Sequence, residues 1–156
     1  MNTLYITNKE KEHLLKELES LHKRRPIVLK EKENAMALGD LSENSEYKEA
    51  IRMLGTIDGN IARYNHIMSV AVFVDPKTLS SDKIKFGATV KIVDIETDKE
   101  YTYQIVSEHG ASVESNSISV TSPLGKALIG KKVDDYVEIN IPKGFKTYQV
   151  IEIKYI

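Results

Sequence analysis

The 156-residue chain contains no cysteine. This absence excludes a disulfide framework, a thiolate zinc site and a cysteine nucleophile, and it is typical of proteins from a reducing cytoplasm. No apolar stretch approaches the roughly 20 residues that a transmembrane helix needs. The opening MNTLYITNKEKEHLL lacks the apolar core of a signal peptide. We therefore expect a cytoplasmic protein without a membrane-spanning segment.

Neither sign of charge dominates, because 22 Lys and Arg residues stand against 23 Asp and Glu residues. The formal net charge of -1 provides no overall attraction to nucleic acid, so any such binding must come from a local patch. A hydrophobic content of 41% and a charged content of 29% are ordinary for a globular protein. The length fits one domain or two small ones.

The residue pattern changes between Val74 and Lys85. Before this segment apolar residues recur at helical spacing, and after it apolar and polar residues tend to alternate. The expected fold class is therefore α+β. We divide the chain into residues 1–74, an N-terminal helical hairpin, and residues 75–156, a β-rich domain.

Two long helices are predicted in the first half. Thr7 and Glu10 form a capping box at the start of the first, which continues to Ala35 with a bend or a loosened turn at Pro26. The second begins just after Gly39, and its apolar residues alternate in steps of three and four: Tyr47, Ala50, Leu54, Ile57, Ile61, Tyr64 and Met68. This seam is typical of a coiled coil, so we expect an antiparallel hairpin that reaches roughly 40–45 Å.

Gly55 and Gly59 are unusual inside such a helix, since each costs on the order of 1 kcal/mol relative to alanine. We expect them to allow a close approach of the first helix near Pro26.

The second half predicts a small sheet with one short helix against it. Strands are expected at residues 88–95, 100–107, 117–120, 136–141 and 147–155. Thr97-Asp98 and Pro142-Lys143-Gly144 are suited to hairpin turns. Ser122 and Pro123 supply the N-cap and first residue of the helix, and Gly130 ends it.

The segment Gly39–Tyr47, GDLSENSEY, places several acidic and amide groups where the two helices meet. Carboxylates at Asp40 and Glu43 suit Mg²⁺, which usually takes only one or two protein carboxylates and keeps several waters. The same Asp-x-x-Glu spacing is also a helix cap, with Asp40 as N-cap, and capping is the commoner role of such pairs. The four histidines, His13, His22, His66 and His109, lack metal-ligand spacing and suit surface or packing roles.

A basic group, Lys23-Arg24-Arg25, precedes Pro26. It could line a path for phosphates toward the hairpin tip. Acidic residues such as Glu31 and Glu33 are interspersed with the basic residues that follow, so a solvated helix face is the more common meaning of this pattern.

GDLSENSEY resembles the GDL-x-EN-x-EY tip motif of the GreA/GreB family of transcription elongation factors. The resemblance continues in one register over essentially the whole chain and favours the GreA branch over GreB. Its further motifs are Arg24-Arg25-Pro26, Gly55-x-x-x-Gly59-x-Ile61, Phe86-Gly87-Ala88-Thr89-Val90, ISVTSPLGKALIG from Ile118 to Gly130, and Tyr148-x-Val150-Ile151-x-Ile153-x-Tyr155.

This resemblance implies a coiled coil followed by an FKBP-like domain that docks at the rim of the secondary channel of bacterial RNA polymerase. The coiled coil would carry Asp40 and Glu43 to the active centre, where they help to hold Mg²⁺ jointly with the polymerase and stimulate hydrolysis of backtracked RNA. The chain would be a monomeric factor, not an enzyme by itself, with no Mg²⁺ bound in isolation and no membrane partner. The implied RNA-binding residues are Arg24, Arg25, Lys48 and Arg52, and the implied polymerase-binding residues are Ser122, Pro123 and Leu124.

Three positions depart from the family pattern. GreA-like relatives often have arginine in place of Met36, a polar residue or histidine in place of Leu38, and arginine or lysine in place of Ile51. Two alternatives to cleavage stimulation therefore remain. One is a competitor that occupies the secondary channel and cleaves poorly, and the other is a coiled-coil adaptor or chaperone with an FKBP-like domain.

Overall fold

The structure, a computed structural model, describes residues 3–41 and 43–156. The chain forms two compact units. One is a helical hairpin of Lys11–Ala71, and the other combines the N-terminal segment through Glu10 with Val72–Ile156. The division between residues 74 and 75 stays a prediction, and the structure adds that the first strand groups with the second half of the chain. Within the described residues, no helix is apolar over a sufficient length to span a membrane.

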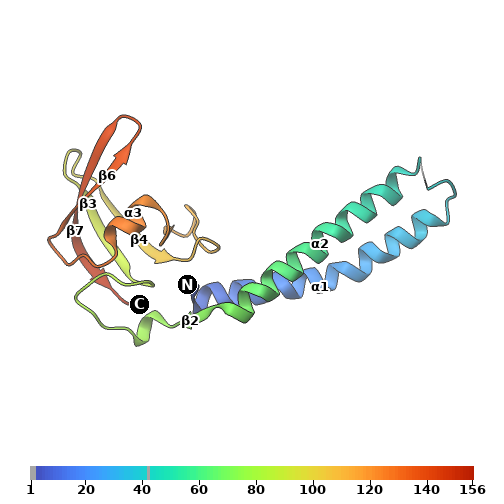
Figure 1. Ribbon diagram of the computed structural model, residues 1–156, viewed down its shortest axis with the longest axis horizontal. Helices are drawn as coiled ribbons and strands as arrows, with labels where there is room; N and C mark the ends of the chain where they lie inside the picture. The colour runs from blue at the N-terminus through green and yellow to red at the C-terminus, as the bar shows by residue number, and fades with distance from the viewer. Residues whose placement is uncertain (1–2, 42) are drawn as a thin grey trace. The chain divides into compact units, whose positions relative to one another are not determined.

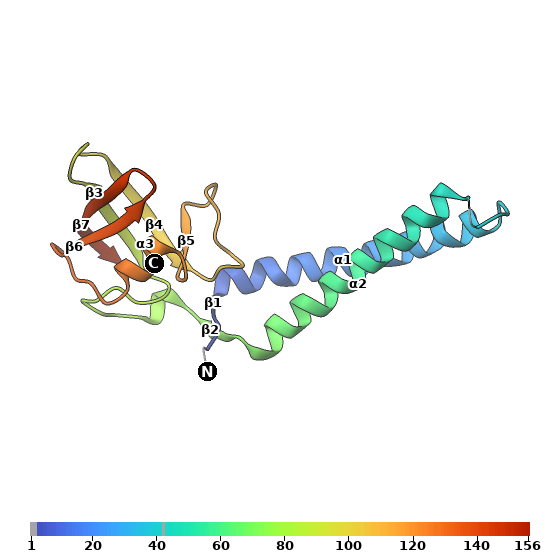
Figure 2. The same ribbon diagram turned by 45° about the horizontal axis from the view of Figure 1, so that its top comes forward.

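The hairpin consists of α1, Asn8–Met36, and α2, Ser45–Val70, which run antiparallel beside one another (Figures 1 and 2). The predicted capping box is confirmed: the Glu10 amide donates to Thr7 Oγ1 at 3.2 Å, and the Thr7 amide donates to Glu10 Oε1 at 3.3 Å. α1 stays helical through Pro26. The predicted start of the second helix after Gly39 is wrong, because α2 begins at Ser45.

The interior of the hairpin is a cluster of four buried residues, Val28, Ala50, Leu54 and Ile57, flanked by Leu21, Leu29, Met53 and Ile61. The central part of the predicted seam is thereby confirmed. Toward the end of α2 the buried residue is Ile67, which is 4% exposed, while Met68 is half-buried. A straight α-helix drifts by about 20° per heptad relative to a 3.5-residue repeat, which moves burial off the predicted position.

Gly55 and Gly59 do not lie at a close contact between the two helices. Both are exposed, and a Cβ added at either would meet no atom within 4 Å. The expectation of tight contact near Pro26 is therefore wrong for these glycines. Their backbone freedom costs helix stability with no packing gain in the hairpin.

Replacing Gly55 or Gly59 with alanine should raise the thermal unfolding midpoint. Each change should stabilise the hairpin by about 0.5–1 kcal/mol, because alanine loses less backbone entropy in a helix interior and meets open space here. The contrasting control is Gly39→Ala, where φ is +113° and an alanine would be strained. A lower midpoint for either helix variant would contradict this account.

The other unit contains a five-stranded sheet in the order β5-β4-β3-β7-β6. Its strands are β3, Thr89–Asp94, β4, Glu100–Val106, β5, Ser117–Ser119, β6, Tyr136–Ile141, and β7, Gly144–Lys154. Neighbours are antiparallel except for β4 and β5, which are parallel. The five predicted strands and the α+β class are confirmed, with strand ends shifted by up to three residues.

One face of this sheet carries the core. Along β3, Val90, Ile92 and Asp94 are buried and alternate with half-buried residues. Val90 and Ile92 belong to a cluster of buried apolar residues, which are Ile84, Ala88, Val90, Ile92, Ile105, Leu128, Val137 and Val150. The short helix α3, Pro123–Leu128, contributes the fully buried Leu128, and Ser122 caps it by accepting from the Gly125 amide at 3.1 Å. The predicted short helix is confirmed.

Two short strands and a 3-10 turn were not predicted. β1, Tyr5–Thr7, pairs in parallel with β2, Val72–Val74, and η1, Pro76–Thr78, follows. Three-residue strands are too short to show an alternating pattern, and these two pair across more than 60 residues of sequence. Glu10 secures the same region, since its buried carboxylate accepts from the Ser107 amide at 3.1 Å and from the Ser107 hydroxyl.

The Asp94 carboxylate should make fold stability pH-dependent. It is buried and accepts from Lys146 Nζ at 2.6 Å and from the Glu96 amide at 2.9 Å, and these bonds hold its pKa below the usual value. Its stabilising effect is therefore complete above the unfolded pKa, about 3.9, and is lost as pH falls toward the folded pKa. In urea unfolding at pH 7, Asp94→Asn should have a lower free energy of unfolding than wild type.

At pH 3 the difference between wild type and Asp94→Asn should shrink. The matched control is Glu100→Gln, which removes the exposed pair between Lys91 and Glu100 and should change little at either pH. A difference that persists unchanged at pH 3 would contradict an ionic role for Asp94.

Candidate functional site at the hairpin tip

The turn between the helices is shaped by Gly39 and Asn44. α1 ends at Met36, and Gly39 has φ of +113°, which favours glycine. Asn44 Oδ1 accepts from the Tyr47 amide at 3.0 Å and caps α2, while Asn44 Nδ2 donates to the Ala35 carbonyl at 2.7 Å. One side chain thus ties the first turn of α2 to the last turn of α1.

Asp40 and Glu43 are both exposed in this turn, at the end of the hairpin opposite Lys11 and Ala71. The alternative in which Asp40 caps the second helix is wrong, because Asn44 occupies that position. Asparagine and aspartate are about equally good N-caps, so residue type alone did not distinguish them. Ser42 of the same motif lies outside the described residues. The turn therefore presents two carboxylates that do not serve as the helix cap.

Asn44 is a residue that the sequence analysis missed, and its removal should loosen the tip. Asn44→Ala should lower stability by about 1–2 kcal/mol, because the α2 cap is lost and the Ala35 carbonyl loses its donor. Asn44→Asp is the matched control, since it keeps the cap acceptor and replaces the donor to the Ala35 carbonyl with a charged acceptor oxygen. Thermal unfolding should rank wild type above Asn44→Asp and Asn44→Asp above Asn44→Ala. Equal midpoints for all three would show that this link does not hold the turn.

Two of the four predicted RNA-binding residues are engaged within the hairpin. Arg25 donates from Nε and Nη2 to the two carboxylate oxygens of Asp58 at 2.6 and 3.3 Å, which links the helices and lowers the pKa of Asp58. Arg52 makes the same kind of double contact with Glu49 at 2.9 and 2.5 Å, and it lowers the pKa of Glu49. Both guanidinium groups would have to exchange these partners before they could bind a phosphate.

The other two predicted RNA-binding residues, Arg24 and Lys48, have exposed side chains. Arg24 Nη2 lies 4.0 Å from Met53 Sδ, a weak contact that leaves its other donors available. Of the four predicted RNA-binding residues, Arg24 and Lys48 are therefore the two that form no ion pair with the described residues.

The tip also carries exposed apolar side chains at the positions that depart from the family pattern. Leu38 is 72% exposed, Met36 45% and Ile51 41%. Leu41 in the turn is a fourth, at 38%. The surface beside Asp40 and Glu43 is thus more apolar than a site built only to hold RNA phosphates requires.

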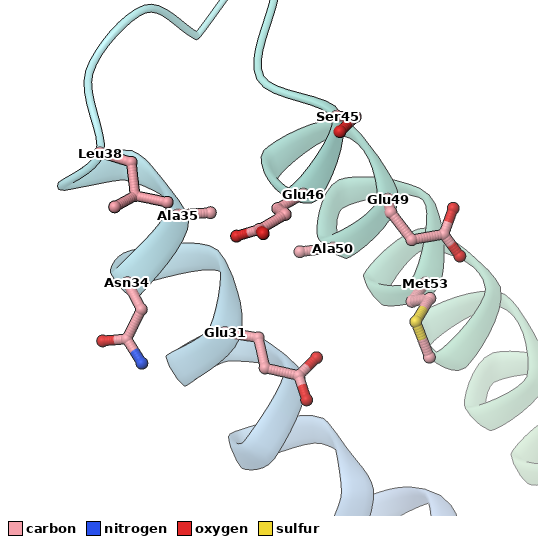
Figure 3. A pocket seen from close by; sticks show the side chains of 9 residues that line it. All are labelled: Glu31, Asn34, Ala35, Leu38, Ser45, Glu46, Glu49, Ala50 and Met53. Carbon is pink, nitrogen blue, oxygen red and sulfur yellow. The ribbon is translucent and has the colours of Figure 1, made fainter.

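A groove of about 660 Å³ lies between the helices next to the tip (Figure 3). Its lining residues are Glu31, Asn34, Ala35 and Leu38 on the α1 side and Ser45, Glu46, Glu49, Ala50 and Met53 on α2. Figure 3 shows Glu31 extending from α1 toward α2 and Glu46 extending from α2 toward α1. The groove is therefore lined by both apolar side chains and carboxylates.

The predicted polymerase-binding residues lie at the start of α3. Ser122 Oγ donates to the Ser119 carbonyl at 2.6 Å as well as capping the helix, and Leu124 packs against the sheet core. Pro123 is exposed. Of the three, Pro123 alone presents its side chain mainly to solvent.

Within the parts of the chain that the structure describes, no three His, Cys, Asp or Glu side chains are grouped closely enough to hold a metal ion. Two exposed carboxylates can still supply part of the coordination that Mg²⁺ accepts, provided that water or another molecule supplies the rest. The chemistry of Asp40 and Glu43 fits such a shared site.

Comparison with known proteins assigns both halves of the chain. The family profile "Transcription elongation factor, N-terminal" matches residues 4–72, and "Transcription elongation factor, GreA/GreB, C-term" matches residues 79–155. The chain belongs to the GreA/GreB family of transcription elongation factors, as its motifs indicated.

Among individual relatives, the transcription elongation factor GreA of Acidiphilium cryptum is 46% identical over 84% of this chain and 83% of its own length. GreA of Zymomonas mobilis is 46% identical over 92% of this chain and 90% of its own, and GreA of Trichlorobacter lovleyi is 43% identical over 99% and 98%. These relatives favour a transcription elongation factor over a coiled-coil adaptor or chaperone.

The chain is also similar to solved structures. The crystal structure of GreA factor homolog 1 of Thermus thermophilus is similar with a TM-score of 0.45 and 27% identity, covering 97% of this chain and 99% of that chain. The GreA/GreB factor of Nitrosomonas europaea has a TM-score of 0.44 and 21% identity, covering 69% of this chain and 93% of that chain.

Proposed function

We propose that this elongation factor enters the secondary channel of bacterial RNA polymerase and stimulates the polymerase to hydrolyse backtracked nascent RNA, which rescues stalled complexes. The observation that carries the proposal is the pair Asp40 and Glu43. They are exposed in the turn of a long hairpin, and neither caps a helix there. We propose that the factor acts as a monomer in the bacterial cytoplasm.

The chemistry assigned to the tip is assistance in trans. A divalent metal, held jointly by the polymerase and by Asp40 and Glu43, would supply Lewis-acid activation of water and would stabilise the attacking and leaving oxygens. Asp40 and Glu43 would act as oxygen ligands and would accept hydrogen bonds from water, because each places a carboxylate in the exposed turn. Their negative charges, placed in advance of the reaction, are the contribution that the polymerase lacks. The chain alone would not be a nuclease.

The supporting contacts are assigned to separate surfaces. Arg24 and Lys48 would attract the RNA phosphates, with Arg25 and Arg52 available only after exchange of Asp58 and Glu49. Docking at the channel rim would use the β-rich unit at the start of α3, where Pro123 is exposed while Ser122 and Leu124 support the helix from within.

The test is a transcript-cleavage assay on backtracked complexes together with a polymerase-binding measurement. Addition of the protein should release short RNA 3′ fragments in a Mg²⁺-dependent reaction, and polymerase without the protein should release them far more slowly. Absence of binding to polymerase would refute the proposal as a whole.

A second candidate function has its own observation. Met36, Leu38 and Ile51 expose apolar side chains on the helix ends that flank the acidic turn, and apolar side chains supply no charge to attract RNA phosphates. A secondary-channel competitor would bind polymerase, displace other channel factors and release little RNA. The same pair of measurements separates this outcome from cleavage stimulation.

A further inference from the structure

The groove beside the tip is not explained by the cleavage chemistry. It is formed by the last turns of α1 and the first turns of α2, and Ala35, Ala50, Leu38 and Met53 supply its apolar surface. Figure 3 shows the two helices on either side of this space, with the side chains of Glu31 and Glu46 directed across it. The space would admit a side chain of another molecule between the helices.

The negative charge of the groove is only partly paired. Among the described residues, Glu31 and Glu46 make no ion pair or side-chain hydrogen bond, although both extend across the groove (Figure 3). Glu49, by contrast, pairs with Arg52, and in Figure 3 its carboxylate points away from α1. Two carboxylates therefore line one groove, and no Lys, Arg or His of the described residues forms an ion pair with either of them.

This combination selects the chemistry of an occupant. RNA phosphates would be repelled by Glu31 and Glu46. An arginine or lysine side chain fits, because its aliphatic stem can cover Ala35, Ala50 and Met53 while its cationic end reaches the carboxylates. Two separated acceptors on facing helices suit the several donors of a guanidinium or ammonium group.

We propose that this groove binds a basic segment of RNA polymerase, contributing at least one arginine or lysine side chain, when the hairpin is inserted. The inference rests on the proposed function for the identity of the partner. It assigns Glu31 and Glu46 to holding the hairpin in place, separate from the role of Asp40 and Glu43. The apolar residues at the tip would then contribute to contact with protein rather than with RNA.

The test compares two double variants with equal net charge. Glu31→Gln with Glu46→Gln removes the groove carboxylates, and Glu19→Gln with Glu33→Gln removes two exposed carboxylates of α1 that do not line the groove. The groove variant should bind polymerase about tenfold or more weakly, and the control should change less than about twofold. Far-UV spectra and unfolding midpoints should stay near wild type, since all four residues are exposed.

A photo-crosslinker at Asn34, which lines the groove, identifies the occupant. The adduct should be a polymerase peptide that contains arginine or lysine. Equal affinity for both double variants, or an adduct formed on RNA, would overturn the groove assignment while leaving cleavage stimulation intact. Failure of the wild-type protein to bind polymerase would overturn both proposals.

Discussion

Asp40→Asn and Glu43→Gln should each reduce stimulated RNA cleavage roughly a hundredfold or more. Both changes keep the size of the side chain while they replace one acceptor oxygen with an NH2 donor and remove the negative charge that a shared metal requires. The loss corresponds to several kcal/mol of transition-state stabilisation, the range expected when a preorganised charge is removed. Polymerase binding should survive, because docking is assigned to the β-rich unit.

The structure sharpens this experiment. Had Asp40 been the N-cap of α2, asparagine would have replaced it without loss, but Asn44 holds that position. Neither variant should change the unfolding midpoint appreciably, because both side chains are exposed, both changes keep their size, and Asn44 still caps α2. Glu33→Gln is the matched control, since it neutralises an exposed carboxylate of α1 outside the turn and should leave cleavage near wild type.

RNA release from backtracked complexes, measured beside polymerase affinity, separates the outcomes. Full cleavage by both Asp40→Asn and Glu43→Gln would sink the assignment of these carboxylates to the reaction. Binding by wild type without cleavage would instead favour the competitor function. Introducing the residues of the family pattern, with Met36→Arg, Leu38→His and Ile51→Lys, would then be the informative next step.

Leu54→Ala should destabilise the hairpin by about 2–5 kcal/mol. Leu54 is 8% exposed and packs in the cluster with Val28, Ala50 and Ile57, so truncation leaves a cavity that these neighbours fill only in part. The thermal unfolding midpoint and the helical far-UV signal should both report the loss. An unchanged midpoint would mean that the helices do not pack along this seam.

Leu15→Ala is the matched control for that change. It makes the same chemical truncation on α1 at a side chain that is 47% exposed and so gives up much less burial. Its effect should be a small fraction of that of Leu54→Ala. Equal losses at the two sites would point to helix propensity instead of packing as the cause.

Local patterns predicted much of this fold. The capping box of Thr7 and Glu10 needs only four consecutive residues, and the alternation along β3 needs six, so both were visible without the structure. The acidic turn was located for the same reason. The sequence did not predict which residue caps α2, because Asp40 and Asn44 are comparable caps. That choice depends on where α1 ends and on the Ala35 carbonyl within reach of Asn44.

The sequence by itself determined the two helices, the five strands of the main sheet and the family motif with Asp40 and Glu43, since periodicity, caps and short motifs are properties of neighbouring residues. Only the tertiary structure decided that Arg25 is paired with Asp58, 33 positions away, that β1 pairs with β2 and belongs to the unit of Val72–Ile156, and that Glu31 and Glu46 line one groove. Contacts of this kind depend on which surfaces the packed helices and strands bring together, and no local pattern specifies that choice.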